Sequence, residues 1–83
     1  MKLKFFRFSG DDYLEFPRGH LRWLDLPNSN TLKFGFSSGS VVITGENLHL
    51  LMRDIVTGKV ESVHIMPPEH KQKDAWFVQK ISS

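Results

Sequence analysis

The stretch between residues 41 and 65 constrains the fold most, because the spacing of its apolar residues changes there from a strand period to a helix period. Residues 41 to 44 alternate as a short strand. Beyond them, apolar residues recur at the i, i+3, i+4, i+7 and i+8 positions that share one helix face. These residues are Leu48, Leu51, Met52, Ile55 and Val56. We therefore expect a helix that ends at Gly58, followed by a strand over residues 60 to 65.

Both ends of this helix carry residues typical of helix termini. Thr44 or Asn47 is expected to cap the free amides of the first turn with its side chain. Gly58 is expected to take the left-handed conformation that ends a helix. The expected buried residues are Leu48, Leu51, Met52 and Ile55, and the expected exposed residues are Asn47, Arg53 and Asp54.

The rest of the chain reads as strands separated by turn residues. Alternation predicts strands over residues 2–8, 13–16, 20–26, 31–36 and 41–44 before the helix, and over 60–65 and 75–81 after it. The order is thus five strands, one helix and two strands. We expect one α+β domain over residues 1–83, built as a strongly curved, mainly antiparallel sheet with the helix packed on one face.

Three of the strands, 2–8, 20–26 and 75–81, carry apolar residues on both faces. In the first, Leu3 and Phe5 are at odd positions whereas Phe6 and Phe8 are at even positions, and positions of different parity face opposite sides of a strand. A bulge between Phe5 and Phe6 would reconcile the two parities, and so would a strand that is covered on both sides. The same switch of parity occurs in 20–26, so apolar surface is expected outside the helix-covered core.

Composition limits the environment and the stability of the chain. A chain of 83 residues buries only about 60 to 65% of its unfolded surface, so its stability is marginal without a further stabilising element. The absence of cysteine excludes disulfides and thiolate chemistry, and a reducing cytoplasm is the expected location. The opening residues lack an apolar run long enough for a signal peptide or a membrane span, so no membrane partner is expected.

The small helix leaves much of the sheet without a cover. A helix of about twelve residues is about 18 Å long and shields about two strands. Either the sheet closes on itself as a small barrel, or a second chain covers the remaining apolar surface. We therefore predict a non-catalytic binding or self-association module that forms a homodimer or binds another protein. The predicted interface residues are Phe6, Phe8, Trp23 and Leu50.

A second hypothesis is a single-stranded nucleic-acid-binding protein, because basic and aromatic residues are interleaved in two places. The candidate contacts are Lys4, Arg7 and Lys33, with Phe6 or Trp23 for stacking. Residues 33–36, Lys-Phe-Gly-Phe, resemble part of the aromatic signature of RNA-recognition strands, without its first glycine. Phe34 and Phe36 share the parity of Leu32, however, and are expected to lie in the core.

Catalysis is the least favoured of the three hypotheses. His64, Glu69 and His70 surround two prolines at a spacing that fits no standard zinc pattern. Asp11 and Asp12 are adjacent in a turn, where side chains point apart. The net charge of +2 comes from basic and acidic residues that are interleaved along the chain, so it does not indicate a cluster of basic residues. We expect no enzyme activity, no cofactor and no metal.

Overall fold

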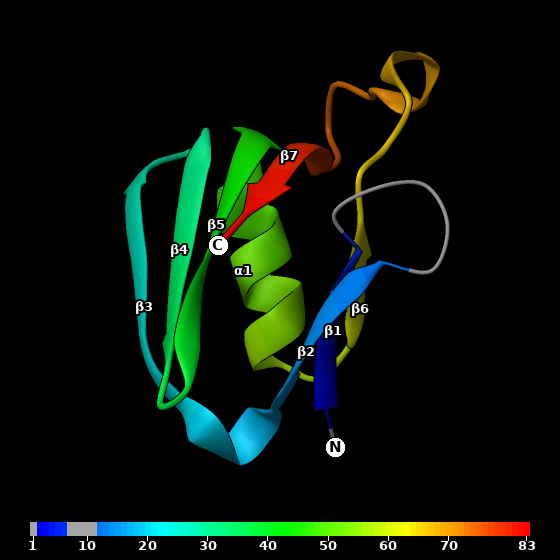
Figure 1. The fold of residues 1–83 in the computed structure, drawn as a ribbon. Coiled ribbons are helices and arrows are strands. Elements are labelled where there is room, and N and C mark those ends of the chain that lie inside the picture. The colour runs from blue at the N-terminus through cyan, green and yellow to red at the C-terminus, as the bar shows by residue number, and fades with distance from the viewer. Residues whose placement is uncertain (1, 7–11) are drawn as a thin grey trace.

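The computed structural model describes residues 2–6 and 12–83, and in these ranges the predicted order of five strands, one α-helix and two strands is confirmed (Figure 1). The elements are β1 (Lys2–Phe6), β2 (Tyr13–Pro17), the 3-10 helix η1 (Arg18–His20), β3 (Leu21–Asn28), β4 (Thr31–Phe36), β5 (Gly39–Glu46), α1 (Leu48–Val56), β6 (Ser62–His64), the 3-10 helix η2 (Pro68–His70) and β7 (Phe77–Ser82).

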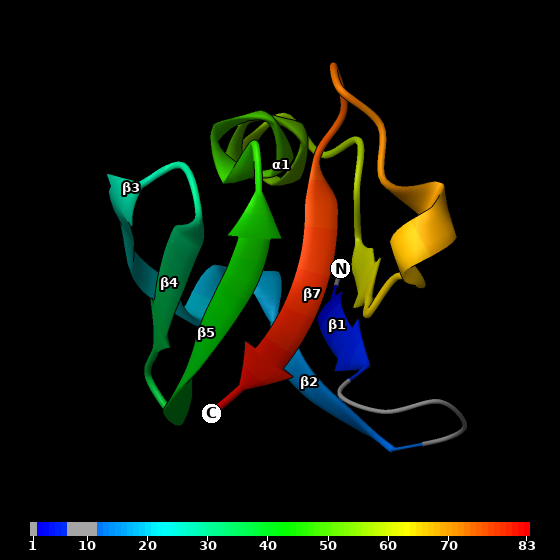
Figure 2. The same ribbon diagram turned by 90° about the horizontal axis from the view of Figure 1, so that it is seen from above.

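The strands form two sheets, so the prediction of one continuous sheet is wrong (Figure 2). The three-stranded sheet has the order β2-β1-β6, and the four-stranded sheet has the order β3-β4-β5-β7. Most pairs are antiparallel, but β6 runs parallel to β1. One backbone hydrogen bond, from Met66 N to Val78 O at 2.9 Å, links the segment after β6 to β7. Alternation shows which residues face the core but not which strand pairs with which, and this is why the split was missed.

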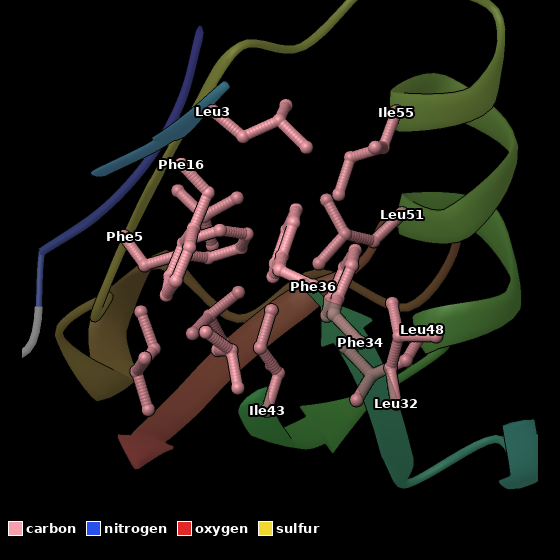
Figure 3. Close-up of a cluster of buried hydrophobic side chains, with 14 residues drawn as sticks. Leu3, Phe5, Phe16, Leu32, Phe34, Phe36, Ile43, Leu48, Leu51 and Ile55 are labelled. Atoms are coloured by element: carbon pink, nitrogen blue, oxygen red, sulfur yellow. The ribbon is translucent and has the colours of Figure 1, made fainter. Parts of the chain in front are cut away.

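The core lies between the two sheets and α1, which enclose it from three sides (Figure 3). Phe5 from the three-stranded sheet meets Phe34 and Phe36 from the four-stranded sheet edge-on, with ring centroids 5.2 and 6.1 Å apart. The expectation that Phe34 and Phe36 are core residues is confirmed. Edge-to-face contacts of this kind are favourable beyond the area that they bury, so they tie the two sheets together.

The predicted burial of the apolar stripe of α1 is confirmed for the residues in its centre and is wrong for those at its margins. Leu48, Leu51 and Ile55 are fully buried, whereas Met52 is half-buried and Val56 is 56% exposed. Val56 is the last residue of α1 and lies about 100° around the helix from the fully buried Ile55, so its side chain is turned toward solvent. Gly58 has a φ of 80°, and the left-handed stop is confirmed.

The start of α1 is held by neighbouring loops and not by a side-chain cap, so the predicted capping role of Asn47 is wrong. Asn47 itself adopts a left-handed conformation with a φ of 54°, which turns its side chain away from the first-turn amides. Its Nδ2 donates hydrogen bonds to the carbonyls of Lys73 and Ala75, each at 3.1 Å. The Leu48 amide donates instead to Ser29 O at 2.8 Å.

Two side chains predicted to be exposed, Asn47 just before α1 and Asp54 within it, are partly buried by contacts with the chain before β7. Asp54 accepts a hydrogen bond from Trp76 Nε1 at 3.2 Å and one from Arg53 Nε at 3.2 Å. Asn47 is half-buried by the contacts described above, whereas Arg53 is exposed as predicted. At the other end, Arg18 Nη2 donates to the Ile55 and Val56 carbonyls at 2.5 and 3.0 Å.

The parity conflicts have two different solutions. The register of β1 with β2 has no shift, so Phe6 points to the outer face of the three-stranded sheet while Phe5 points inward. In β3 a register shift lies between Leu21 and Trp23, so the two residues face opposite ways despite their shared parity. The predicted residue Phe8 lies outside the described residues.

Candidate functional site

The outer face of the three-stranded sheet carries an aromatic row, which we define as Tyr13, Phe6 and His64. Phe6 lies in the central strand β1, directly opposite Tyr13 of β2 on one side and His64 of β6 on the other. Because side chains at opposed positions point to the same face, the three rings lie side by side across all three strands.

The rings of this row are in contact. The Phe6 and His64 rings are stacked with centroids 4.3 Å apart and an interplanar angle of 6°, and the Phe6 and Tyr13 centroids are 4.9 Å apart. Phe6 is half-buried by its two neighbours, whereas Tyr13 is 42% exposed and His64 is also exposed. The row therefore presents a continuous aromatic surface that the core does not use.

Charged side chains of both signs lie next to the aromatic row. Glu15 forms ion pairs with Lys2 at 3.3 Å and Lys4 at 3.8 Å, and the Lys4 ammonium lies 5.5 Å from the centroid of the Tyr13 ring. All of these side chains are at least partly exposed, so each pair contributes little to stability. They form a polar border along one side of the row.

The outer face of the four-stranded sheet carries a separate feature, Trp23 lying over Gly35. The two residues are directly opposed in the register of β3 and β4. A Cβ atom on Gly35 would lie 2.0 Å from Cε2 and 2.1 Å from Nε1 of the indole, so the ring occupies the space of the missing side chain. Trp23 nevertheless remains 50% exposed. One face of the indole rests on the sheet and the other is free to contact a ligand.

The predicted interface residues do not come together on one surface. Phe6 is in the three-stranded sheet, Trp23 is in the four-stranded sheet and Leu50 is half-buried on α1 (Figure 1). One flat interface cannot contain all three.

The predicted nucleic-acid contacts are divided in the same way. Lys4 lies beside the aromatic row, whereas Lys33 is in β4 of the other sheet, two residues from Gly35. Arg7 lies outside the described residues. A nucleic-acid site that uses Phe6 with Lys33, or Trp23 with Lys4, is therefore not formed by one face.

The residues considered for metal binding or catalysis are dispersed. His64 is stacked on Phe6, whereas Glu69 and His70 lie in η2. Within residues 2–6 and 12–83, no group of three or more histidine, aspartate or glutamate side chains is placed to hold a metal ion. Asp12 is exposed, and Asp11 lies outside the described residues.

Sequence reasoning missed Tyr13 and His64 as partners of Phe6. The hairpin of the first two strands was predicted, and its register was the signal that would have placed Tyr13 opposite Phe6. No comparable signal existed for His64, because its strand reaches β1 only through the parallel pairing of segments almost sixty residues apart. The sequence alone cannot show such a pairing.

No family model, curated protein or solved structure matches this chain. In the part of the chain that the structure describes, no helix has the length and apolar character needed to span a membrane.

Proposed function

We propose that this protein is a non-catalytic self-association module that forms a homodimer through the outer face of its three-stranded sheet. The observation that carries this proposal is the aromatic row, which crosses the whole sheet and remains partly open to solvent. Aromatic residues are enriched at the energetic centres of protein interfaces. Contacting rings on a regular sheet are also largely preordered, so little conformational entropy is lost when a partner binds.

The charged border favours a second copy as the partner. Lys4 and Glu15 have opposite charges and are directly opposed on the same face as the row. A two-fold axis brings the same patch of each subunit together, so Lys4 of one copy can meet Glu15 of the other. The patch is therefore self-complementary in charge as well as aromatic at its centre.

The small size of the three-stranded sheet supports the same proposal. Its strand β6 has three residues and its strands β1 and β2 have five each. A small sheet of this kind gains stability when its second face is packed. A dimer contact through the aromatic row would supply that packing without a further element from the same chain.

Light scattering of charged variants tests the proposal. Tyr13→Glu and Phe6→Glu each place a carboxylate at the centre of the contact, where burial without a partner is unfavourable, and should give folded monomers. Val56→Glu adds the same charge at an exposed apolar residue of α1 and should keep the mass of the unmodified protein. Tyr13→Phe should also keep it.

Circular dichroism identifies variants that unfold. If Phe6→Glu unfolds because Phe6 is half-buried, Tyr13→Glu at the more exposed position decides the question. A folded Tyr13→Glu variant with the mass of the unmodified dimer would contradict the proposed interface.

A further inference from the structure

A second, independent surface lies on the outer face of the four-stranded sheet, around Trp23. The register shift in β3 turns Trp23 outward while Leu21 and Leu24 pack against the core. Gly35 provides the space in which the indole lies against the sheet. The result is an aromatic ring held in place from below with half of its surface exposed.

We infer that this face binds single-stranded nucleic acid, with a base stacked on Trp23 and phosphates bound by Lys33 and Lys80. Stacking on an exposed aromatic ring is the contact by which proteins hold unpaired bases of any sequence. Lysine side chains on the same groove or face bind the phosphates. The inference uses none of the residues in the proposed dimer interface, so the two proposals are tested independently.

The register places both lysines on the same face as Trp23. Lys33 is directly opposite Val42, and Lys80 is directly opposite Thr44, one row further along the sheet. Their neighbours Leu32, Ile43 and Ile81 are buried, so alternation directs both lysines outward. The two lysines lie two strands apart, or about 10 Å across the sheet, and their long side chains can reach successive phosphates.

The composition of this face favours a nucleic acid over a second protein chain. Apart from Trp23, Val42 and Phe77, the outward positions carry polar side chains, namely Asp25, Asn28, Thr31, Lys33, Ser40, Thr44, Glu46, Lys80 and Ser82. Asp25 and Glu46 are the acidic members of this set, but Glu46 is paired with Lys71, so the two lysines outweigh the remaining charge of Asp25. Phe77 is buried, so Trp23 is the exposed aromatic ring of this face. An exposed ring among hydroxyl and amine groups suits a stacking contact with hydrogen bonds, whereas the core of a protein interface is more apolar.

The edge of the sheet beside Trp23 is also poorly suited to strand addition. Strand β3 has two register shifts and contains Pro27, which lacks an amide donor. Bulges and prolines on edge strands prevent pairing with another chain. A partner at Trp23 should therefore bind the face of the sheet and not its edge.

Fluorescence anisotropy of labelled single strands of DNA and RNA, about 12 nucleotides long, tests the inference at low salt. Trp23→Leu keeps an apolar cover over Gly35 but removes the aromatic face, and should weaken binding by about 5- to 150-fold. Trp23→Phe keeps a stacking ring and should retain most of the affinity. Gly35→Ala displaces the indole without altering any charge, and should weaken binding as Trp23→Leu does.

The proposed phosphate contacts of Lys33 and Lys80 are tested by the salt dependence of single-strand binding. Lys33→Gln and Lys80→Gln should each lower the slope of log affinity against log salt by about 0.7, the value for one phosphate contact on a single strand. Lys59→Gln removes the same charge after α1, outside the four-stranded sheet, and should leave the slope unchanged.

Four results would overturn the inference. The first is no binding at about 100 μM protein, which is the weak end of the range for non-specific binders. The second is equal affinity for a duplex, whose bases are not free to stack on Trp23. The third is equal affinity of Trp23→Leu and the unmodified protein. The fourth is a Trp23→Leu variant with half the solution mass of the unmodified protein in the absence of nucleic acid, which would make this face a contact between copies of this chain.

Discussion

The indole of Trp23 fills the space that a side chain on Gly35 would occupy, although the two residues belong to different strands and one of them is half-exposed. This relationship depends on the register shift after Leu21, which turns Trp23 outward. A glycine in the interior of a strand weakens a sheet, because it has no side chain to pack. Here the tryptophan of the neighbouring strand supplies that packing.

Replacing Gly35 by alanine should displace the indole, because a Cβ atom would lie 2.0 Å from Cε2 of Trp23. The ring is at the end of a side chain on an edge strand and can swing away. The free energy of unfolding should therefore stay within about 1 kcal/mol of that of the unmodified protein. In a Trp76→Phe background, fluorescence reports Trp23 alone and should become more accessible to an aqueous quencher. Unchanged quenching would contradict the contact.

Replacing Gly45 by alanine should be much more harmful than replacing Gly35. A Cβ atom on Gly45 would lie 1.9 Å from the backbone oxygen of Phe77, at the register shift where β5 meets β7, and a backbone cannot swing away. We expect a loss of about 2 to 3 kcal/mol in chemical denaturation. Gly19→Ala is the control, since no atom lies within 4 Å of its Cβ position, and it should cost less than about 0.5 kcal/mol.

Truncating Leu51 to alanine should lower the free energy of unfolding by about 2 to 5 kcal/mol, because Leu51 is fully buried in the middle of the α1 stripe. Val56→Ala is the matched control, since Val56 is 56% exposed and should lose less than about 0.5 kcal/mol. Denaturant titrations measure both variants. A loss below about 1 kcal/mol for Leu51→Ala would show that this stripe does not face the core.

Asp54 should make folding depend on pH in the acid range. Burial raises the pKa of Asp54, but hydrogen bonds from Trp76 and Arg53 and the charges of Arg53 and Lys59 outweigh it and hold the pKa below its usual value. A lowered folded-state pKa stabilises the protein above about pH 4 and loses this effect as the pH falls through the folded-state value.

The comparison of the unmodified protein with Asp54→Asn isolates this contribution. The difference between their free energies of unfolding should be constant above about pH 5 and should shrink below about pH 4. Trp76→Phe removes one of the two hydrogen bonds to Asp54 and should reduce the same pH dependence. A difference that grows as the pH falls would contradict the sign of the shift.

The features of this fold that the sequence predicts are those set by residues close together in the chain. The helical spacing of Leu48, Leu51 and Ile55 is local, and their burial was predicted correctly. The left-handed stop at Gly58 was predicted for the same reason. Asn47 was assigned the wrong role because its partners, Lys73 and Ala75, lie almost thirty residues further along the chain.

The candidate surfaces were only partly predictable. The parity conflicts correctly marked the strands that contain Phe6 and Trp23 as having apolar residues on both faces. A strand with apolar residues on both faces can have a bulge, as β3 does, or an outer aromatic contact, as β1 does. Which of the two occurs depends on strand pairing, and the alternation of residues within one strand carries no information about that pairing. The division into two sheets then places Phe6 and Trp23 on separate surfaces, so the one predicted interface becomes two proposed sites.

The solution mass of the unmodified protein tests the proposed self-association most directly. Light scattering between about 10 and 100 μM covers the range in which a dimer with a micromolar dissociation constant is populated. Dimerisation through the aromatic row predicts twice the mass of the 83-residue chain, with a fall toward the monomer mass only on dilution. The mass of one chain at every concentration would contradict the proposal.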